Sequence, residues 1–217
     1  MWSNLFRFLL ELLQTIKFKL GVDRKNFVLK HIQRHHPQSI LEIGVFNGGF
    51  ARRMLKVATK SQFVPIEYVG VDLFAENFSE DIKKVEVSLI PSDRAYIERA
   101  LELPNTSVKL YSGYSSKVLP TLVDKYDMIL IDGGHSYQTV KEDFLNSINL
   151  LAEGGTIFFD DYTNQRGVSD GMFGINQVIS EINKGEFQIS ISKNRDWFWK
   201  NYGVLELRMV KVSRIKR

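Results

Sequence analysis

The stretch Tyr126–Tyr162, YDMILIDGGHSYQTVKEDFLNSINLLAEGGTIFFDDY, decides the fold of this chain. It contains a buried strand that ends in Asp132, a helix of about four turns, a Gly-Gly turn, and a second buried strand that ends in Asp160 and Asp161. Two hydrophobic strands joined by a crossover helix form a right-handed βαβ unit, so the strands should lie side by side and parallel. The sequence therefore predicts an α/β fold.

The carboxyl ends of these two strands should gather acidic side chains. The carboxylates of Asp132, Asp160 and Asp161 would meet there, with His135 one turn past the first strand. Open α/β sheets bind their ligands at this edge. Because so much negative charge is costly unless a cation or a proton relieves it, the pattern predicts a divalent metal held by oxygen ligands.

The chain from Gly21 onward alternates between helical and strand patterns. Helices are expected at about 24–35, 50–58, 92–103, 115–124 and 173–184, and further strands at 39–45, 67–73, 107–113, 187–192 and 203–212. The last two strands, joined by the link 193–202, should pair antiparallel. We predict a Rossmann-like, seven-stranded, mostly parallel sheet with helices on both faces and a C-terminal antiparallel hairpin. Residues 38–217 would form this domain, and residues 1–37 a helical extension.

Composition narrows the function classes. The chain has 217 residues and no cysteine, which removes disulfides, thiolate nucleophiles and thiolate zinc sites. This composition is compatible with a reducing compartment, and we expect a cytoplasmic location. The net charge of +4 is modest and partly resides in the basic tail at the end of the chain. We therefore expect no nucleic acid among its partners.

Apolar residues between Trp2 and Leu20 recur at helical spacing. Arg7, Glu11 and Lys17 interrupt the run, which is too short and too charged to span a bilayer. Two interpretations stay open. The helix packs on the domain or on a second copy in a homo-oligomer, or it makes peripheral contact with a membrane interface.

A glycine-rich turn follows the strand at 39–45. In EIGVFNGG, residues 42–49, Gly44 and Gly48 have the spacing G-x-x-x-G, which differs from the G-x-G-x-x-G pattern that places a pyrophosphate on a helix N-terminus. Glu42 would repel phosphate and attract an ammonium group. Asp72, at the end of the next strand, could accept hydrogen bonds from two ribose hydroxyls. A ligand with a ribose and a cationic amino-acid end fits S-adenosylmethionine.

Together, EIGVFNGG and GVD at 70–72 resemble the cofactor-binding motifs of class I S-adenosylmethionine-dependent methyltransferases, over roughly residues 38–162. EIGVF-x-G is similar to the cation-dependent O-methyltransferases of the caffeoyl-CoA and catechol type. IDGGHSY and FFDDY are similar to the macrocin-type sugar O-methyltransferases and the cephalosporin-hydroxylase-like proteins. Two residues depart from the caffeoyl-CoA pattern: Asp161 stands where that group has asparagine, and His135 lies near its usual lysine.

The resemblance implies a role for each matching residue. Asp132, Asp160 and Asp161 would bind Mg²⁺ or Mn²⁺, and His135 would be the catalytic base. The implied cofactor-binding residues are Glu42, Gly44, Phe46, Asn47, Gly48, Asp72, Gly113, Tyr114, Ser115 and Asp132.

The expected function is thus a metal-assisted O-methyltransferase that uses S-adenosylmethionine and acts on a hydroxyl of a sugar or other small-molecule acceptor. The alternatives are a class I methyltransferase that needs no metal and a non-catalytic protein that binds the cofactor.

Overall fold

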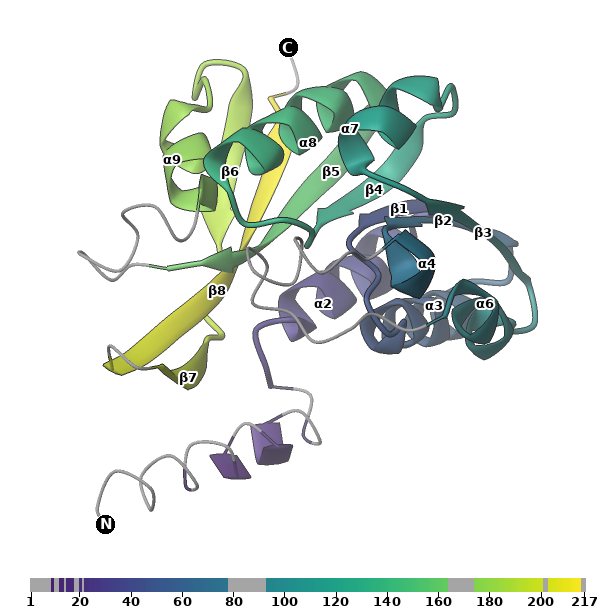
Figure 1. The fold of residues 1–217 in the computed structure, drawn as a ribbon, viewed down its shortest axis with the longest axis horizontal. Coiled ribbons are helices and arrows are strands. Elements are labelled where there is room, and N and C mark those ends of the chain that lie inside the picture. The colour runs from purple at the N-terminus through teal and green to yellow at the C-terminus, as the bar shows by residue number, and fades with distance from the viewer. Residues whose placement is uncertain are drawn as a thin grey trace.

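A central mixed sheet organises the structure, a computed structural model that describes residues 9, 12–13, 15–17, 20, 22–77, 93–163, 174–200 and 203–215. The strands along its main path lie in the order β3-β2-β1-β4-β5-β8-β6 (Figure 1). Their bounds are Ser39–Ile43 (β1), Ile66–Asp72 (β2), Thr106–Ser112 (β3), Tyr126–Ile131 (β4), Leu151–Tyr162 (β5), Phe187–Ile191 (β6) and Gly203–Arg214 (β8). Strands β1 to β5 are parallel, whereas β8 is antiparallel to both β5 and β6. The predicted parallel core and C-terminal hairpin are confirmed.

Helices cover both faces of the sheet, as predicted. They are α2 (Asn26–His35), α3 (Gly49–Ser61), α4 (Phe74–Asn77), α6 (Arg94–Leu101), α7 (Ser115–Val118), α8 (Tyr137–Leu150) and α9 (Gly174–Glu181), with a 3₁₀ turn, η1, at Leu119–Thr121. Of the segment 73–91, where a loop with a short helix was expected, α4 falls within the described residues and residues 78–91 lie outside them.

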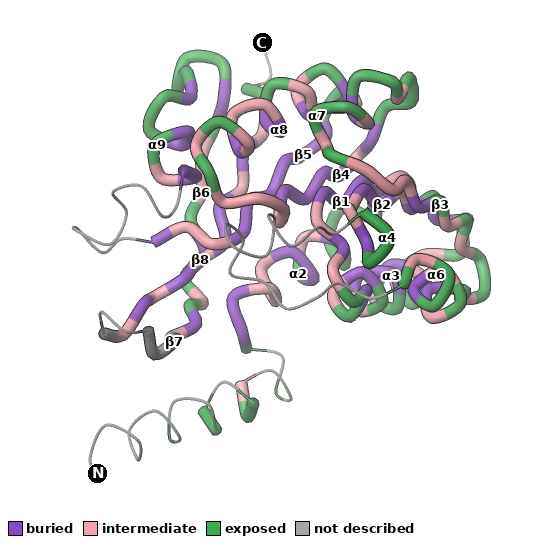
Figure 2. Tube along the Cα trace, in the orientation of Figure 1, coloured by how far each residue is buried: buried purple, intermediate pink, exposed green. Residues whose placement is uncertain are grey.

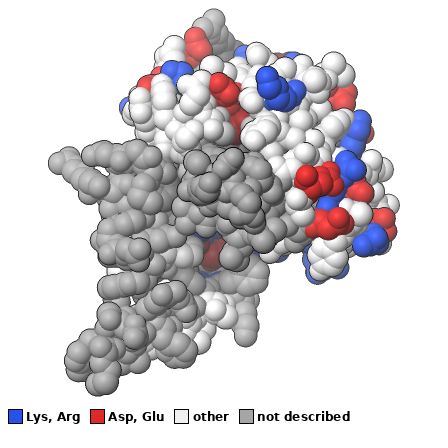
Figure 3. All heavy atoms as spheres, in the orientation of Figure 1, with Lys and Arg blue, Asp and Glu red and all other residues white. Residues whose placement is uncertain are grey.

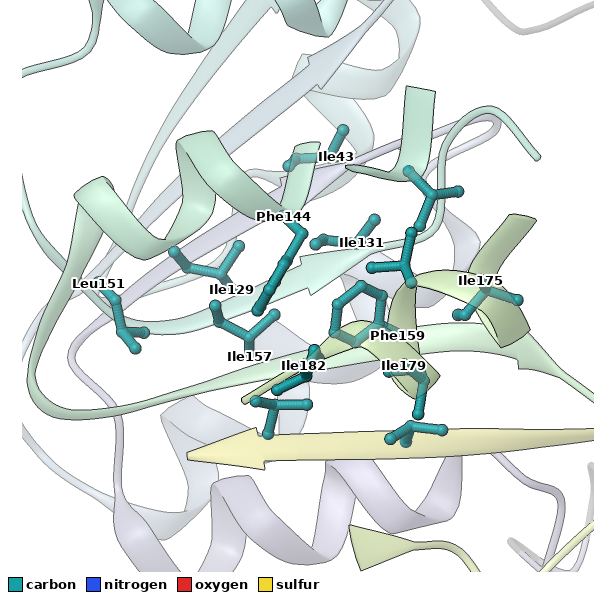
Figure 4. Close-up of a cluster of buried hydrophobic side chains, with 14 of the residues drawn as sticks. Ile43, Ile129, Ile131, Phe144, Leu151, Ile157, Phe159, Ile175, Ile179 and Ile182 are labelled. Carbon is teal, nitrogen blue, oxygen red and sulfur yellow. The ribbon is translucent and has the colours of Figure 1, made fainter. Parts of the chain in front are cut away.

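Strand β4 shows why both faces are apolar. Ile129 and Ile131 point into a core shared with α8 and α9, whereas Met128 and Leu130 point into a core shared with α2, α3 and α6. Figure 4 shows the first of these cores, around Phe144 of α8. Because alternate side chains of a strand face opposite sides of the sheet, a parallel strand covered on both sides reads as a continuous apolar run.

The link between the last two predicted strands contains a further strand that was not predicted, β7 (Asp196–Lys200). It pairs antiparallel with the first half of β8, while the second half of β8 pairs with β5 and β6. This strand is short, and its sequence DWFWK has no apolar alternation. Its first residue, Asp196, accepts hydrogen bonds from Arg24 in the segment before α2.

Helix α2 belongs to the core of the domain. Val28 and Ile32 are fully buried and Leu29 is nearly so, all within the core shared with α3. The second half of the predicted extension 1–37 therefore packs on the sheet. The boundary at residue 37 stays a prediction.

The apolar residues that the structure describes between positions 9 and 20 are exposed. Their exposed fractions lie between 41% and 70%, and they are Leu9, Leu12, Leu13, Ile16 and Leu20 (Figure 2). Lys17 of the same segment contacts the domain, because its Nζ lies 3.2 Å from Asp196 Oδ1 and over the ring of Trp197. Packing of the five apolar residues on the chain's own domain stays a prediction. Contact with a second copy and contact with a membrane interface both stay predictions. Among the described residues, no helix has the length and apolar character needed to cross a bilayer.

Charged residues are mixed on the face shown in Figure 3, where Lys and Arg alternate with Asp and Glu over the described surface. No extended basic patch forms on the described part of this face. The expectation that nucleic acid is not a partner stays a prediction.

Candidate active site

The predicted site residues lie at the carboxyl ends of five neighbouring strands, β3, β2, β1, β4 and β5. Strand register places Ile43 of β1 between Val71 of β2 and Ile131 of β4, and Asp72 of β2 opposite Ser112 of β3. The residues that follow these strand ends are therefore brought together at one edge of the sheet, as the sequence predicted. Among them, Gly113 has φ +148°, and Tyr114 and Ser115 lead into α7.

The glycine-rich turn packs tightly against the loop after β4. Gly44 has φ +91°, and a Cβ there would lie 2.2 Å from the carbonyl oxygen of Asp132. Gly48 has φ +71°, and a Cβ there would lie 2.9 Å from Ile97. Asn47 accepts a hydrogen bond from the backbone N–H of Gly49 at 2.9 Å, at the start of α3. Glycine at 44 and 48 is thus required by the protein's own packing, before any ligand is considered.

Asp72 holds this turn in place. Its Oδ2 accepts hydrogen bonds from the backbone N–H groups of Val45 and Phe46, both at 2.7 Å, and its Oδ1 accepts one from Phe74 at 3.1 Å. A carboxylate has about four acceptor positions, so these contacts leave capacity for a ribose hydroxyl. The predicted ribose contact stays a prediction.

Glu42 lies beneath the turn and is 1% exposed. Its carboxyl accepts a hydrogen bond from the hydroxyl of Tyr68. Burial raises the pKa of Glu42 to about 8, against the lowering effect of the Tyr68 hydrogen bond. The predicted contact of Glu42 with an ammonium group stays a prediction, and this pKa favours the neutral acid in the free protein near pH 7.

Because its pKa is raised in the folded state, Glu42 should make the protein less stable as pH rises. Its unfolded pKa is near 4.5, so between pH 6 and pH 8 the folded state alone holds the proton and progressively loses it. Over this pH range the free energy of unfolding of the wild type should fall by about 2 kcal/mol more than that of Glu42→Gln. One pKa unit corresponds to about 1.4 kcal/mol. Urea unfolding at several pH values measures both curves. Parallel curves would show that Glu42 is ionised throughout.

The three carboxylates predicted as metal ligands do converge, but two cations join them. Arg24 Nε and Nη2 donate to the two oxygens of Asp160 at 2.5 and 2.9 Å, and Nη2 also donates to Asp161 at 2.9 Å. Lys25 Nζ lies 2.8 Å from Asp132 Oδ2 and 3.4 Å from Asp160 Oδ2. Arg24 is 9% exposed and Asp160 is 3% exposed. The cluster is therefore a buried, hydrogen-bonded ion network.

The network shifts the acidities of its members. Burial alone would raise the pKa of Asp160, but Arg24 and Lys25 outweigh it and hold that pKa well below its usual range. Burial raises the pKa of Asp132 to about 7, against the lowering effect of Lys25. Burial would lower the pKa values of both cations, yet the carboxylates keep them above their ordinary values. Arg24 and Lys25 therefore stay charged at any pH near neutral.

His135 is oriented by Asp161. Its Nε2 lies 2.9 Å from Asp161 Oδ2. Asp161 has φ +60°, an uncommon conformation for a residue other than glycine that often marks a functional position. A pocket of about 20 Å³ opens beside the pair, lined by residues that include Asp132, Gly134 and Ile175. A carboxylate can only accept, so Nε2 donates the hydrogen and Nδ1 becomes the basic nitrogen.

The residues present do not fit the predicted magnesium ion. Each of the three carboxylates already has an oxygen paired with Arg24 or Lys25, and no group of three or more His, Cys, Asp or Glu within the described ranges could hold a metal ion. A divalent ion among them would also meet two fixed positive charges. Two like unit charges about 4 Å apart repel by roughly 4 kcal/mol at an effective dielectric constant of about 20.

No motif in the sequence points to Arg24 and Lys25. They lie more than a hundred positions before Asp132 and Asp160, in a segment without a recognisable motif. A weak signal existed, because adjacent cations at the start of a helix oppose the helix dipole and so need another reason to be there.

The strand order and the antiparallel last strands define the class I methyltransferase fold. A family described as a methyltransferase domain (Methyltransf_24) matches residues 41–162, more than half of the chain, and the chain belongs to this family.

A curated relative and two solved structures are similar to the chain. The uncharacterized protein R132 of Acanthamoeba polyphaga mimivirus is 27% identical over 147 residues, which cover 68% of this chain and 62% of that protein. The O-methyltransferase TomG from Streptomyces achromogenes, involved in tomaymycin synthesis and solved in complex with SAM, has TM-score 0.55 at 14% identity, covering 87% and 78% of the two chains. A Staphylococcus aureus protein provisionally assigned as a caffeoyl-CoA O-methyltransferase has TM-score 0.58 at 17% identity, covering 94% and 91%. At these identities the structural matches establish the fold.

Proposed function

We propose that the protein transfers a methyl group from S-adenosylmethionine to a hydroxyl of a small-molecule acceptor, a sugar or a similar compound. The observation that carries this proposal is the contact between His135 and Asp161 beside a pocket at the carboxyl edge of a methyltransferase fold. TomG, a structural neighbour solved in complex with SAM, is an O-methyltransferase involved in tomaymycin synthesis, which supports the cofactor and transfer to an oxygen atom.

His135 takes the proton of the acceptor hydroxyl. Asp161 holds the imidazole in one orientation and stabilises the imidazolium that forms. As the O–H bond breaks, the oxygen forms a bond to the sulfonium methyl carbon and the C–S bond of the cofactor breaks. The products are a methyl ether and S-adenosylhomocysteine, and His135 then returns its proton to solvent. The cofactor supplies the electrophile, so the protein mainly orients and deprotonates.

This reaction proceeds without a divalent metal, because Arg24 and Lys25 already neutralise the carboxylates. The metal-independent alternative is favoured for the same reason. The non-catalytic alternative is disfavoured because a degenerate enzyme usually loses part of its polar set. That set is intact here and consists of Glu42, Asp72, Asp132, Asp160 and Asp161.

Replacement of Asp72 by alanine tests the cofactor claim. The variant should bind S-adenosylhomocysteine about 1.5–3 kcal/mol more weakly, the range for hydrogen bonds to a charged group. Calorimetry measures the affinity, with Asp124→Ala as a control, because Asp124 is exposed and precedes β4 at the opposite edge of the sheet. Asp72 also supports the turn, so the titration is repeated with a 2′,3′-dideoxy analogue of the ligand. An equal loss for both ligands would show that Asp72 does not contact the ribose.

A further inference from the structure

We infer that Arg24 and Lys25 take the place of a divalent cation in this site: they neutralise its carboxylates, and Arg24 positions the base His135 through Asp161. The positioning role rests on the proposed function. The cation replacement does not, because it concerns the carboxylates alone.

The two cations share their carboxylates as a bound metal ion would. Arg24 bridges Asp160 and Asp161, and Lys25 bridges Asp132 and Asp160. The contact of Arg24 with Asp160 is bidentate, the geometry in which a guanidinium binds a carboxylate most strongly. Together they reach every carboxylate that the sequence marked as a metal ligand.

The segment that carries the cations is held in place by Asp196 of β7 and by Asn194, which precedes β7. Asn194 Nδ2 donates to the carbonyl oxygens of Val22 and Asp23 at 3.1 and 3.2 Å. Asp196 Oδ2 accepts from both the backbone N–H and Nη1 of Arg24, each at 3.2 Å. The cations therefore enter the site on a backbone that is held by Asn194 and by Asp196 of β7.

Arg24 connects this frame to the base. Its Nη2 contacts Asp161 Oδ1, while the other oxygen of Asp161 contacts His135 Nε2. Loss of Arg24 would free Asp161 to rotate and release the imidazole from its single tautomer. Arg24 is thus a positioning residue that acts through Asp161.

Manganese binding tests the replacement directly. The wild type is first freed of metal with a chelator, the chelator is removed, and Mn²⁺ is then added. Electron paramagnetic resonance should show no Mn²⁺ bound in the cluster. Lys25→Met should bind Mn²⁺ and unfold at a higher temperature when Mn²⁺ is present, because Asp132 and Asp160 lose their shared cation. Lys30→Met, an exposed lysine of α2, is the matched control and should behave like the wild type.

Two results would overturn the replacement. One is Mn²⁺ that binds to the wild type and no longer binds to Asp160→Asn. This result does not depend on whether Lys25→Met folds. The other is a folded Lys25→Met that binds no Mn²⁺.

Histidine NMR tests the positioning role. Nitrogen shifts should show His135 as the Nε2–H tautomer in the wild type and as a mixture in Arg24→Lys, which keeps the charge but not the bridge. The chain has 4 histidines, so the signals can be assigned. An unchanged tautomer in Arg24→Lys would contradict the role. Both experiments omit cofactor and acceptor, so a negative result in either contradicts this inference and leaves the proposed function standing. Failure of the protein to bind S-adenosylmethionine would contradict the proposed function and leave the cation replacement standing.

Discussion

Alanine in place of His135 is expected to slow methyl transfer by roughly 10²–10⁴-fold, the usual range for loss of a general base. Asp161 holds the imidazole at 2.9 Å and the pair borders the pocket, so no other described histidine can take this role. Cofactor affinity should stay nearly unchanged, because His135 faces the acceptor side of the proposed reaction.

Transfer of a labelled methyl group from S-adenosylmethionine to a panel of catechols and sugar diols measures this effect. His35→Ala is the control, since His35 is exposed at the far end of α2. Activity of His135→Ala within a few-fold of the wild type would mean that another group takes the proton.

Leucine in place of Arg24 is expected to lower the free energy of unfolding by about 3–5 kcal/mol, the cost of removing one partner of a buried ion pair. Asp160 would remain buried without its bidentate partner. Arg94→Leu is the matched control. Arg94 pairs with Glu76 at the surface, both side chains being 42% exposed, so its loss should cost under about 1 kcal/mol.

Urea unfolding compares the two variants with the wild type. The double variant Arg24→Leu/Asp160→Leu should regain part of the lost free energy of unfolding, because it no longer buries a carboxylate that lacks its guanidinium partner. If Arg24→Leu cost no more than Arg94→Leu, the ion network would contribute little to folding.

The fold was accessible from the sequence because its signals are local. The βαβ unit at 126–162 and the strand-to-helix turn at 42–49 each lie within a few dozen residues. Their hydrophobic patterns correspond to the helices and strands of the structure. Strand β7 was missed because five residues without alternation carry no such signal, and its existence depends on pairing with β8.

The candidate site was predicted only in part, for a related physical reason. Parallel strands must end at one edge, so the meeting of Asp132 with Asp160 and Asp161 follows from topology. The groups that neutralise them do not follow from topology. Arg24 and Lys25 come from a segment whose position depends on tertiary contacts with Asn194 and Asp196.

The two glycines of the turn show a further limit. Their presence indicated a close approach, but sequence alone could not say to what. The structure shows that Gly44 approaches Asp132 and Gly48 approaches Ile97. A pattern can thus locate a crowded position without identifying the crowding group.

The most direct test of the central claim is a calorimetric titration of S-adenosylmethionine into chelator-treated wild-type protein, repeated with magnesium. The claim predicts saturable one-to-one binding whose affinity is the same in both titrations, because the chain supplies its own cations. Absence of binding under both conditions, or binding that requires magnesium, would contradict it.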